Sequence, residues 1–223
     1  MEINLSEHFT YKKLIKFTLH TIAMMIFTSI YGVVDGLFVS NVVGNNAFAS
    51  INLIFPPIMM IGTIGFMIGT VGSAPIISYH FGAGDKIELK SLLSKSIKLL
   101  GLVAIIMTLL AEILAKPLAM IFVSYDEELL KLTTNAIRLF SISYIISWFN
   151  IFTSSFFTAL NNGIVSAVIS FLRTFVFQVI MIYLLPYFWG VDGIWLAVFV
   201  AELLSLVVSL VFLIINKKRY GYV

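Results

Sequence analysis

The sequence predicts an all-α integral membrane protein with six transmembrane helices and both termini in the cytoplasm. First, 60% of its 223 residues are hydrophobic and only 11% are charged, whereas soluble domains contain about 45–50% apolar and about 25% charged residues. Second, the apolar residues form runs of about 20 or more without period-two alternation, which favours helices over membrane strands. Third, most Lys and Arg residues gather at the ends of these runs that would share one side of the membrane, as the positive-inside rule requires of the cytoplasmic side.

The first three predicted spans differ in their polar content. Phe17–Val39 follows a polar segment with several lysines, and a polar, uncharged turn separates it from Ala47–Tyr79. This long second span contains Pro56, Pro57 and a series of glycines, and a charged loop, His80–Lys98, leads to the third span, Leu99–Leu118. We expect Glu112 to pair with Lys116, four residues later on the same helix face.

The last three predicted spans are joined by short connectors. An acidic connector, Tyr125–Lys131, precedes Ile137–Leu160, and Asn161–Gly163 is a turn signal before Ser166–Tyr187. A second turn at Trp189–Gly193 leads to Ile194–Ile215, which ends at three basic residues. The net charge of +3 is explained by this topology, so no nucleic-acid partner is expected, and the chain is predicted to be a multi-pass protein of the plasma membrane.

Charged residues inside predicted spans are the first candidates for function, because burying a charge in a bilayer is unfavourable by about 2.5–3.5 kcal/mol. Asp35, flanked by Gly32 and Gly36, is interpreted either as a carboxylate that binds H⁺ or Na⁺ or as an interfacial residue that reaches water. Glu202 is interpreted as a second protonatable site or, preferably, as the partner of a polar group on the neighbouring span, Arg173 or Gln178.

The second span offers a different candidate, a hinge or a close packing face. Prolines and glycines permit bends and close helix contact in membranes, and the residues concerned are Pro56, Pro57, Gly62, Gly65 and Gly69. The sequence shows no catalytic constellation and contains no cysteine. We therefore expect neither an enzyme nor a metal site, and no cofactor beyond a coupling ion.

Several stretches resemble the MATE family of multidrug and toxin extrusion transporters. VVDGLFVSNVVGNNAFASINLIFP (Val33–Pro56) and FGAGDK (Phe81–Lys86) resemble the start of the family's N-terminal lobe. DEELLKLTTNAIRLFSISY, SSFFTALNNGIVSAVISFLRTFVFQ and LLPYFWGVDGIWLA resemble the last three helices of its C-terminal lobe. The resemblance therefore implies one composite MATE-like lobe, with residues 1–120 from the first part, residues 121–223 from the second, and the join within Asp85–Met120.

This resemblance implies a function and two alternatives. It implies efflux of drugs or organic cations by antiport with H⁺ or Na⁺, with Asp35 at the position of the family's cation-coupling acid. Because the family usually has two lobes, it also implies a homodimer, or a partner that supplies a second lobe. One alternative is a truncated remnant or structural protein that does not transport. The other is a flippase for lipid-linked substrates, which the scarcity of Arg and Lys inside the spans makes less attractive.

Overall fold

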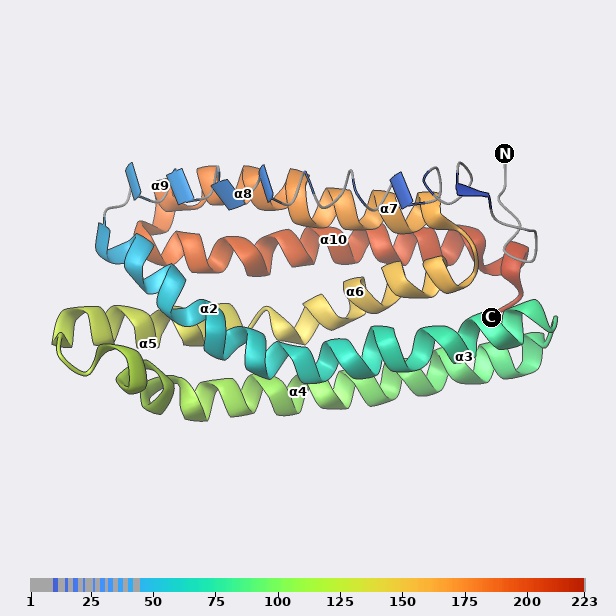
Figure 1. Cartoon of the computed structure of the whole chain (residues 1–223), viewed down its shortest axis with the longest axis horizontal. Coiled ribbons are helices and arrows are strands. Elements are labelled where there is room, and N and C mark those ends of the chain that lie inside the picture. The colour runs from blue at the N-terminus through green and yellow to red at the C-terminus, as the bar shows by residue number, and fades with distance from the viewer. Residues whose placement is uncertain are drawn as a thin grey trace.

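The computed structural model describes residues 45–222 without a gap and, before them, residues 10, 11, 15, 18, 19, 22, 26, 29, 30, 32, 33, 36, 37, 40 and 41. The first predicted span, Phe17–Val39, falls mostly outside these residues. Within residues 45–222 all regular structure is helical (Figure 1), which agrees with the predicted all-α class.

The second predicted span consists of three consecutive helical segments. These are α2 (Asn45–Phe66), the π-helical turn η2 (Met67–Gly72) and α3 (Ser73–Gly82). α2 continues through Pro56 and Pro57, and η2 follows it directly and contains Gly69 and Gly72. π-turns of this kind interrupt membrane helices locally without ending them.

The prediction of a charged loop at His80–Lys98 is wrong for most of this range. The turn is short, and α4 already begins at Lys86 and runs for 38 residues to Val123. The carboxylate of Asp85 caps this helix by accepting a hydrogen bond from the backbone N–H of Glu88 at 3.0 Å. Leu89 and Leu93 are buried, so the polar end of α4 packs as a helix, although hydropathy marks only its apolar part.

The fourth predicted span, Ile137–Leu160, is a bent helix pair that starts earlier than expected. α5 (Glu127–Ser141) and α6 (Tyr144–Ala159) meet at an angle of 49°. Most of the predicted acidic connector is the first turn of α5, because Asp126 accepts a hydrogen bond from the N–H of Leu129 at 3.0 Å and caps the helix.

The last two predicted spans agree more closely with the structure. The fifth comprises α7 (Gly163–Phe171), the π-helical turn η3 (Leu172–Phe177), α8 (Gln178–Leu184) and the short α9 (Pro186–Trp189). The sixth is α10 (Val191–Tyr220). Gly190, in the turn between them, has φ of +54°, a conformation that glycine adopts without strain.

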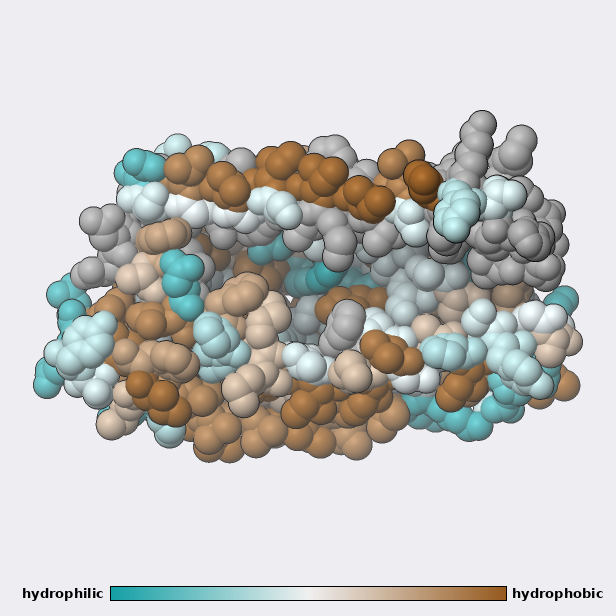
Figure 2. Space-filling view, in the orientation of Figure 1, coloured by the Kyte–Doolittle hydropathy of each residue, from teal (hydrophilic) through white to brown (hydrophobic). Residues whose placement is uncertain are grey.

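The helices form an elongated bundle that is apolar on its outside. α4 and α10 run along its length, with α6 between them in the view of Figure 1, and Figure 2 shows broad hydrophobic surfaces along two of its edges. Among the described residues, α4, residues 163–189 and α10 are long and apolar enough to cross a membrane, and the α5–α6 pair is a fourth candidate. The six-span count and the orientation remain predictions.

α4 presents a row of small residues to the interior of the bundle. Ala104, Ala111, Ala115 and Ala119 are at most 2% exposed, which lets neighbouring helices approach closely. A separate core combines aliphatic and aromatic side chains and joins α6 to α3, α4, α7 and the C-terminal residues, where Tyr222 packs on Phe156. The predicted parts, residues 1–120 and 121–223, are in contact through these cores, and the predicted join falls largely within the unbroken helix α4.

Candidate functional site

A cavity of about 630 Å³ lies among α2, α4, α6, α8 and α10. Its walls are mainly apolar and include Ile54 and Met59 of α2, Met107 of α4, Trp148 of α6 and Ile182 of α8. Figure 2 shows a hollow in the middle of the bundle with hydrophilic surface at its floor. Cavities of about 300–1,000 Å³ with few polar groups are typical of sites for drug-sized ligands.

An ion pair forms part of this cavity's wall. Nη1 of Arg173, in the π-turn η3, donates a hydrogen bond to Oε1 of Glu202 on α10 at 2.7 Å. The side chain of Glu202 is 6% exposed and that of Arg173 is 22% exposed, so the guanidinium is the more accessible end. The structure thus brings together two of the three residues that the sequence grouped, and Gln178 lines the same cavity nearby.

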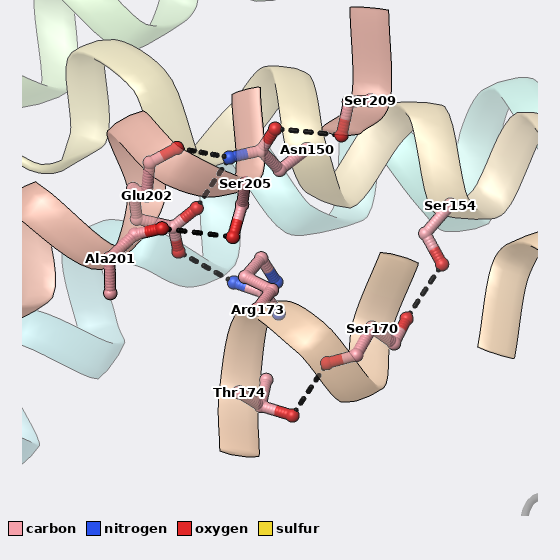
Figure 3. A network of polar contacts seen from close by, with 9 residues as sticks. All are labelled: Asn150, Ser154, Ser170, Arg173, Thr174, Ala201, Glu202, Ser205 and Ser209. Atoms are coloured by element: carbon pink, nitrogen blue, oxygen red, sulfur yellow. Dashed lines mark hydrogen bonds and ion pairs between the residues drawn. The ribbon is translucent and has the colours of Figure 1, made fainter. Parts of the chain in front are cut away.

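Asn150 of α6 completes the polar group, and sequence reasoning missed it. Its Nδ2 donates to Oε2 of Glu202 at 2.7 Å and to the backbone oxygen of Glu202 at 2.9 Å, while its Oδ1 accepts from Ser209 at 2.9 Å (Figure 3). Asn150 is fully buried. The available signal was an amide in the middle of an apolar run, a position where a side chain needs a partner in the membrane.

The buried carboxylate of Glu202 accepts hydrogen bonds from side chains of two other helical segments, α6 and η3. A charge in the membrane is tolerated when an opposite charge and hydrogen bonds compensate it. Arg173 supplies the charge and Asn150 supplies the further donors, so the group is neutral as a whole. α6, η3 and α10 are thereby held together by polar contacts at the cavity.

Hydroxyl groups connect α6 to α7 beside the ion pair. Ser154 lies within hydrogen-bonding distance of the hydroxyls of Ser166 (2.9 Å) and Ser170 (2.7 Å), and Thr158 donates to Ser166 at 2.7 Å. Figure 3 shows that Ser154 and Ser170 point toward each other from facing helices. Such contacts hold membrane helices in register.

Glu112 has a different partner from the one expected. The structure joins it to α5 rather than to Lys116: the hydroxyl of Ser141 donates to Oε1 at 3.0 Å, and Nε of Arg138 lies 3.8 Å from Oε2. Helix packing overrides the local pairing, because the facing helix brings a hydroxyl and a cation to the same carboxylate. The contact joins α4 to the end of α5, next to the bend between α5 and α6.

The remaining predicted positions are placed as follows. Gly62 of α2 lines the cavity and faces Tyr144, to which a Cβ at this position would come within 3.8 Å. Pro57 is buried and Pro56 is exposed. Gly65 lies in α2 and Gly69 in η2, and the surroundings of both fall outside the description. Asp35 also lies outside the described residues.

The described residues contain no group of three or more His, Asp or Glu side chains that are placed to hold a metal ion. Chemically, the site offers an apolar cavity, a guanidinium and several neutral polar groups. It can bind an amphipathic molecule and orient it.

Comparison with known proteins identifies the family. The MatE family model matches residues 21–184, which is more than half of the chain. A search of curated proteins gave no match. The fold matches that of a MATE protein in the straight conformation, with a TM-score of 0.85 and 15% identity, over 100% of this chain and 51% of that chain.

Two further solved structures give the same picture. A multidrug resistance MATE family transporter of the MOP superfamily, in an outward-facing conformation, has a TM-score of 0.84 and 16% identity over 99% of this chain and 50% of that chain. The Vibrio cholerae MATE transporter VcmN, in its bent form, has a TM-score of 0.79 and 17% identity over 99% of this chain and 49% of that chain. The chain thus spans about half the length of these proteins. Its apolar helices agree with the predicted multi-pass protein of the plasma membrane, and the chain belongs to the MATE family.

Proposed function

We propose that the chain is half of an efflux transporter, which exports drugs or organic cations by antiport with H⁺ or Na⁺. The proposal rests on one observation, a drug-sized cavity lined by the Arg173–Glu202 ion pair. The fold around this cavity matches about half the length of a solved MATE transporter. An apolar cavity with a few polar groups suits molecules that are apolar over most of their surface.

Asp35 is the proposed coupling residue. The proposal rests on its place in the motif VVDGLFVSN and on the general association of membrane carboxylates with ion pathways. A carboxylate that binds H⁺ or Na⁺ on one side of the membrane and releases it on the other would drive export. The ion-pair network has another role in this scheme, since it joins α6, η3 and α10 and forms one wall of the cavity.

A second lobe is proposed to complete the transport path. It would come from a second copy of this chain or from a partner, in the parallel arrangement of transporters that are built from two similar halves. The composite origin of the lobe, from residues 1–120 and 121–223, and its six spans with both termini inside belong to the same proposal.

The flippase alternative gains no support from the cavity. Arg173 is the one basic residue that lines it in the described part of the chain, and its charge is balanced by Glu202. A lipid-linked substrate with a phosphate head would need more positive charge.

Dye efflux tests the transport proposal. The full chain is expressed in an efflux-deficient bacterium, and accumulation of ethidium, a fluorescent cation, is compared with accumulation in cells that carry the empty vector. We expect lower accumulation with the wild type and vector-level accumulation with Asp35→Asn, at equal amounts of protein in the membrane. Wild-type accumulation equal to that of the vector would favour a remnant that does not transport.

Two further measurements test the coupling and the second lobe. Collapse of the proton gradient by a protonophore should abolish efflux under H⁺ coupling, and removal of external Na⁺ should abolish it under Na⁺ coupling. Native mass measurement in detergent should show a dimer or a complex with a partner. A strictly monomeric chain that still exports dye would refute the two-lobe proposal.

A further inference from the structure

One end of the bundle is strongly basic in the part of the chain that the structure describes. The start of α4 and the end of α10 form this end together (Figure 1), and a Cβ at Gly221 would lie 2.8 Å from the side chain of Lys86. Residues 80–98 and 216–222 contain seven Lys or Arg residues and only two Asp or Glu residues. Residues 112–138, toward the opposite end, contain three and four. The basic end is therefore the one that attracts anions.

Lys98 lies at the end of an exposed apolar row on α4. Leu102 and Ile105, four and seven residues later, lie on the same side of the helix and are each more than half exposed. Figure 2 shows hydrophobic surface along α4 that gives way to hydrophilic surface toward the basic end. Exposed apolar rows of membrane helices contact acyl chains, and the long side chain of a lysine reaches the headgroups beside them. Lys98 is exposed and can therefore reach a lipid headgroup.

The end of α10 has the same arrangement. Ile214 and Val211, four and seven residues before Lys218, are exposed on the side of the helix that Lys218 continues. Lys217 and Lys218 are both exposed. Among the residues that the structure describes, no carboxylate forms an ion pair with Lys98, Lys217 or Lys218. Two apolar rows on different helices thus end in lysines whose charge the described residues leave uncompensated.

Helix electrostatics account for only part of this pattern. The dipole of a helix favours cations in its last turn, which applies to Lys217 and Lys218 but not to Lys98, the thirteenth residue of α4. Lys95, one turn before Lys98, pairs with Glu88 at 3.4 Å, so its ammonium group is directed away from the apolar row. The positive-inside rule explains on which side of a membrane such lysines lie, but not what they bind there.

We propose that the chain binds anionic phospholipids at two places in the leaflet on its basic side. One headgroup lies at Lys98 on α4, and another lies at Lys217 and Lys218 on α10. The lipid phosphate compensates the lysines, and the acyl chains cover the exposed rows, so one molecule matches both features. A soluble anion would match the lysines alone. The inference goes beyond the proposed function, because it requires neither transport nor a second lobe.

Native mass measurement of the purified full chain in detergent tests the inference. The protein is titrated with dioleoyl phosphatidylglycerol, and the lipids bound to each chain are counted. Dioleoyl phosphatidylcholine, whose headgroup has no net charge, and glycerophosphoglycerol, the anionic headgroup without acyl chains, are the comparison compounds. We expect two tightly bound phosphatidylglycerol molecules per chain, with an affinity at least about fivefold higher than for either comparison compound, since each lysine near an anionic lipid contributes about this factor.

Substitutions then separate the two places. Lys98→Gln should remove one of the two tightly bound lipids, and the double variant Lys217→Gln/Lys218→Gln should remove the other. Lys90→Gln is the matched control, because Lys90 is an equally exposed cation of α4 but lies eight residues, or about 12 Å, farther from the apolar row. This control should keep both lipids. Exposed lysines contribute little to folding, so the variants should remain folded.

The outcomes separate this inference from the proposed function. Equal affinity for phosphatidylglycerol and phosphatidylcholine would overturn it, and so would equally tight binding of the free headgroup. Lys98→Gln or the α10 double variant that keeps both lipids would also overturn it, as would a loss in Lys90→Gln equal to that in Lys98→Gln. Selective lipid binding by a chain that exports no dye would support the inference and refute efflux, whereas dye efflux without selective lipid binding would do the reverse.

Discussion

Replacing Glu202 by leucine should destabilise the helix bundle by about 2.5–3.5 kcal/mol. The substitution removes the carboxylate that accepts from Arg173 at 2.7 Å and leaves the guanidinium unpaired beside an apolar cavity. Asn150 keeps its bond to the backbone oxygen of residue 202 and its bond from Ser209. The expected loss is therefore mainly that of one uncompensated charge in the membrane, and the 22% exposure of Arg173 places it near the lower end of the range.

The double variant Arg173→Leu/Glu202→Leu provides the decisive comparison. Removing one member of a buried ion pair is strongly destabilising, whereas replacing both by apolar residues is often neutral. We therefore expect the double variant to lie within about 1 kcal/mol of the wild type. A stable double variant would show that the pair is unnecessary for folding, so its role could then be tested by ligand binding.

Stability is measured by titrating the purified protein in mixed micelles with sodium dodecyl sulfate and following helix content by circular dichroism. Glu88→Leu is the matched control, because Glu88 pairs with Lys95 at 3.4 Å with side chains that are 37% and 69% exposed. An exposed pair of this kind contributes about 0–1 kcal/mol. The reasoning is refuted if Glu202→Leu loses no more stability than Glu88→Leu, or if the double variant is as unstable as the single one.

Three further predictions concern packing, pH and topology. Gly193→Ala should destabilise the protein by about 1–3 kcal/mol in the same titration, because the added Cβ would lie 2.5 Å from the backbone oxygen of Leu185, just after α8. Gly163→Ala is the control and should be neutral, because its Cβ would meet nothing within 4 Å. Equal losses of stability in the two variants would contradict this prediction. Burial, and secondarily Tyr220, raises the pKa of Tyr222, so the contribution of this phenol to stability is fully present below about pH 10 and is lost at higher pH. In Tyr222→Phe the late-titrating phenolate absorbance should decrease by the contribution of one tyrosine, and an unchanged late absorbance would contradict this. The chain has no cysteine, so a single introduced cysteine reports its own side of the membrane. In the predicted orientation, Lys90→Cys lies in the cytoplasm and should be protected from an impermeant thiol reagent in intact cells, whereas Lys131→Cys lies outside and should be labelled. The opposite labelling pattern would reverse the predicted orientation.

The local features of the fold could be predicted from the sequence. Long apolar runs indicate membrane helices wherever they occur, and the turns at Asn161–Gly163 and Trp189–Gly193 are marked by residues that favour turns. The helix starts were less visible. Asp85 and Asp126 cap α4 and α5 within charged segments, and hydropathy reports where a helix becomes apolar rather than where it begins.

The candidate site was only partly predictable. Charge inside a span identified Glu202, and its position beside the fifth span suggested Arg173, because an isolated charge in lipid needs a partner. Asn150 was missed because the sequence does not show which face of α6 turns toward α10. Glu112 was assigned to Lys116 by helix spacing alone, whereas the facing helix α5 supplies its contacts.

The sequence by itself determined that this protein is an all-α membrane protein and which of its residues are too polar for lipid. Hydropathy and turn preference are properties of neighbouring residues, so they can be read along the chain. The tertiary structure decided the 49° bend between α5 and α6, the three-helix contact around Glu202 and the cavity of about 630 Å³. These depend on how helices distant in sequence rotate and pack against one another, and side-chain shape across their interfaces sets that geometry.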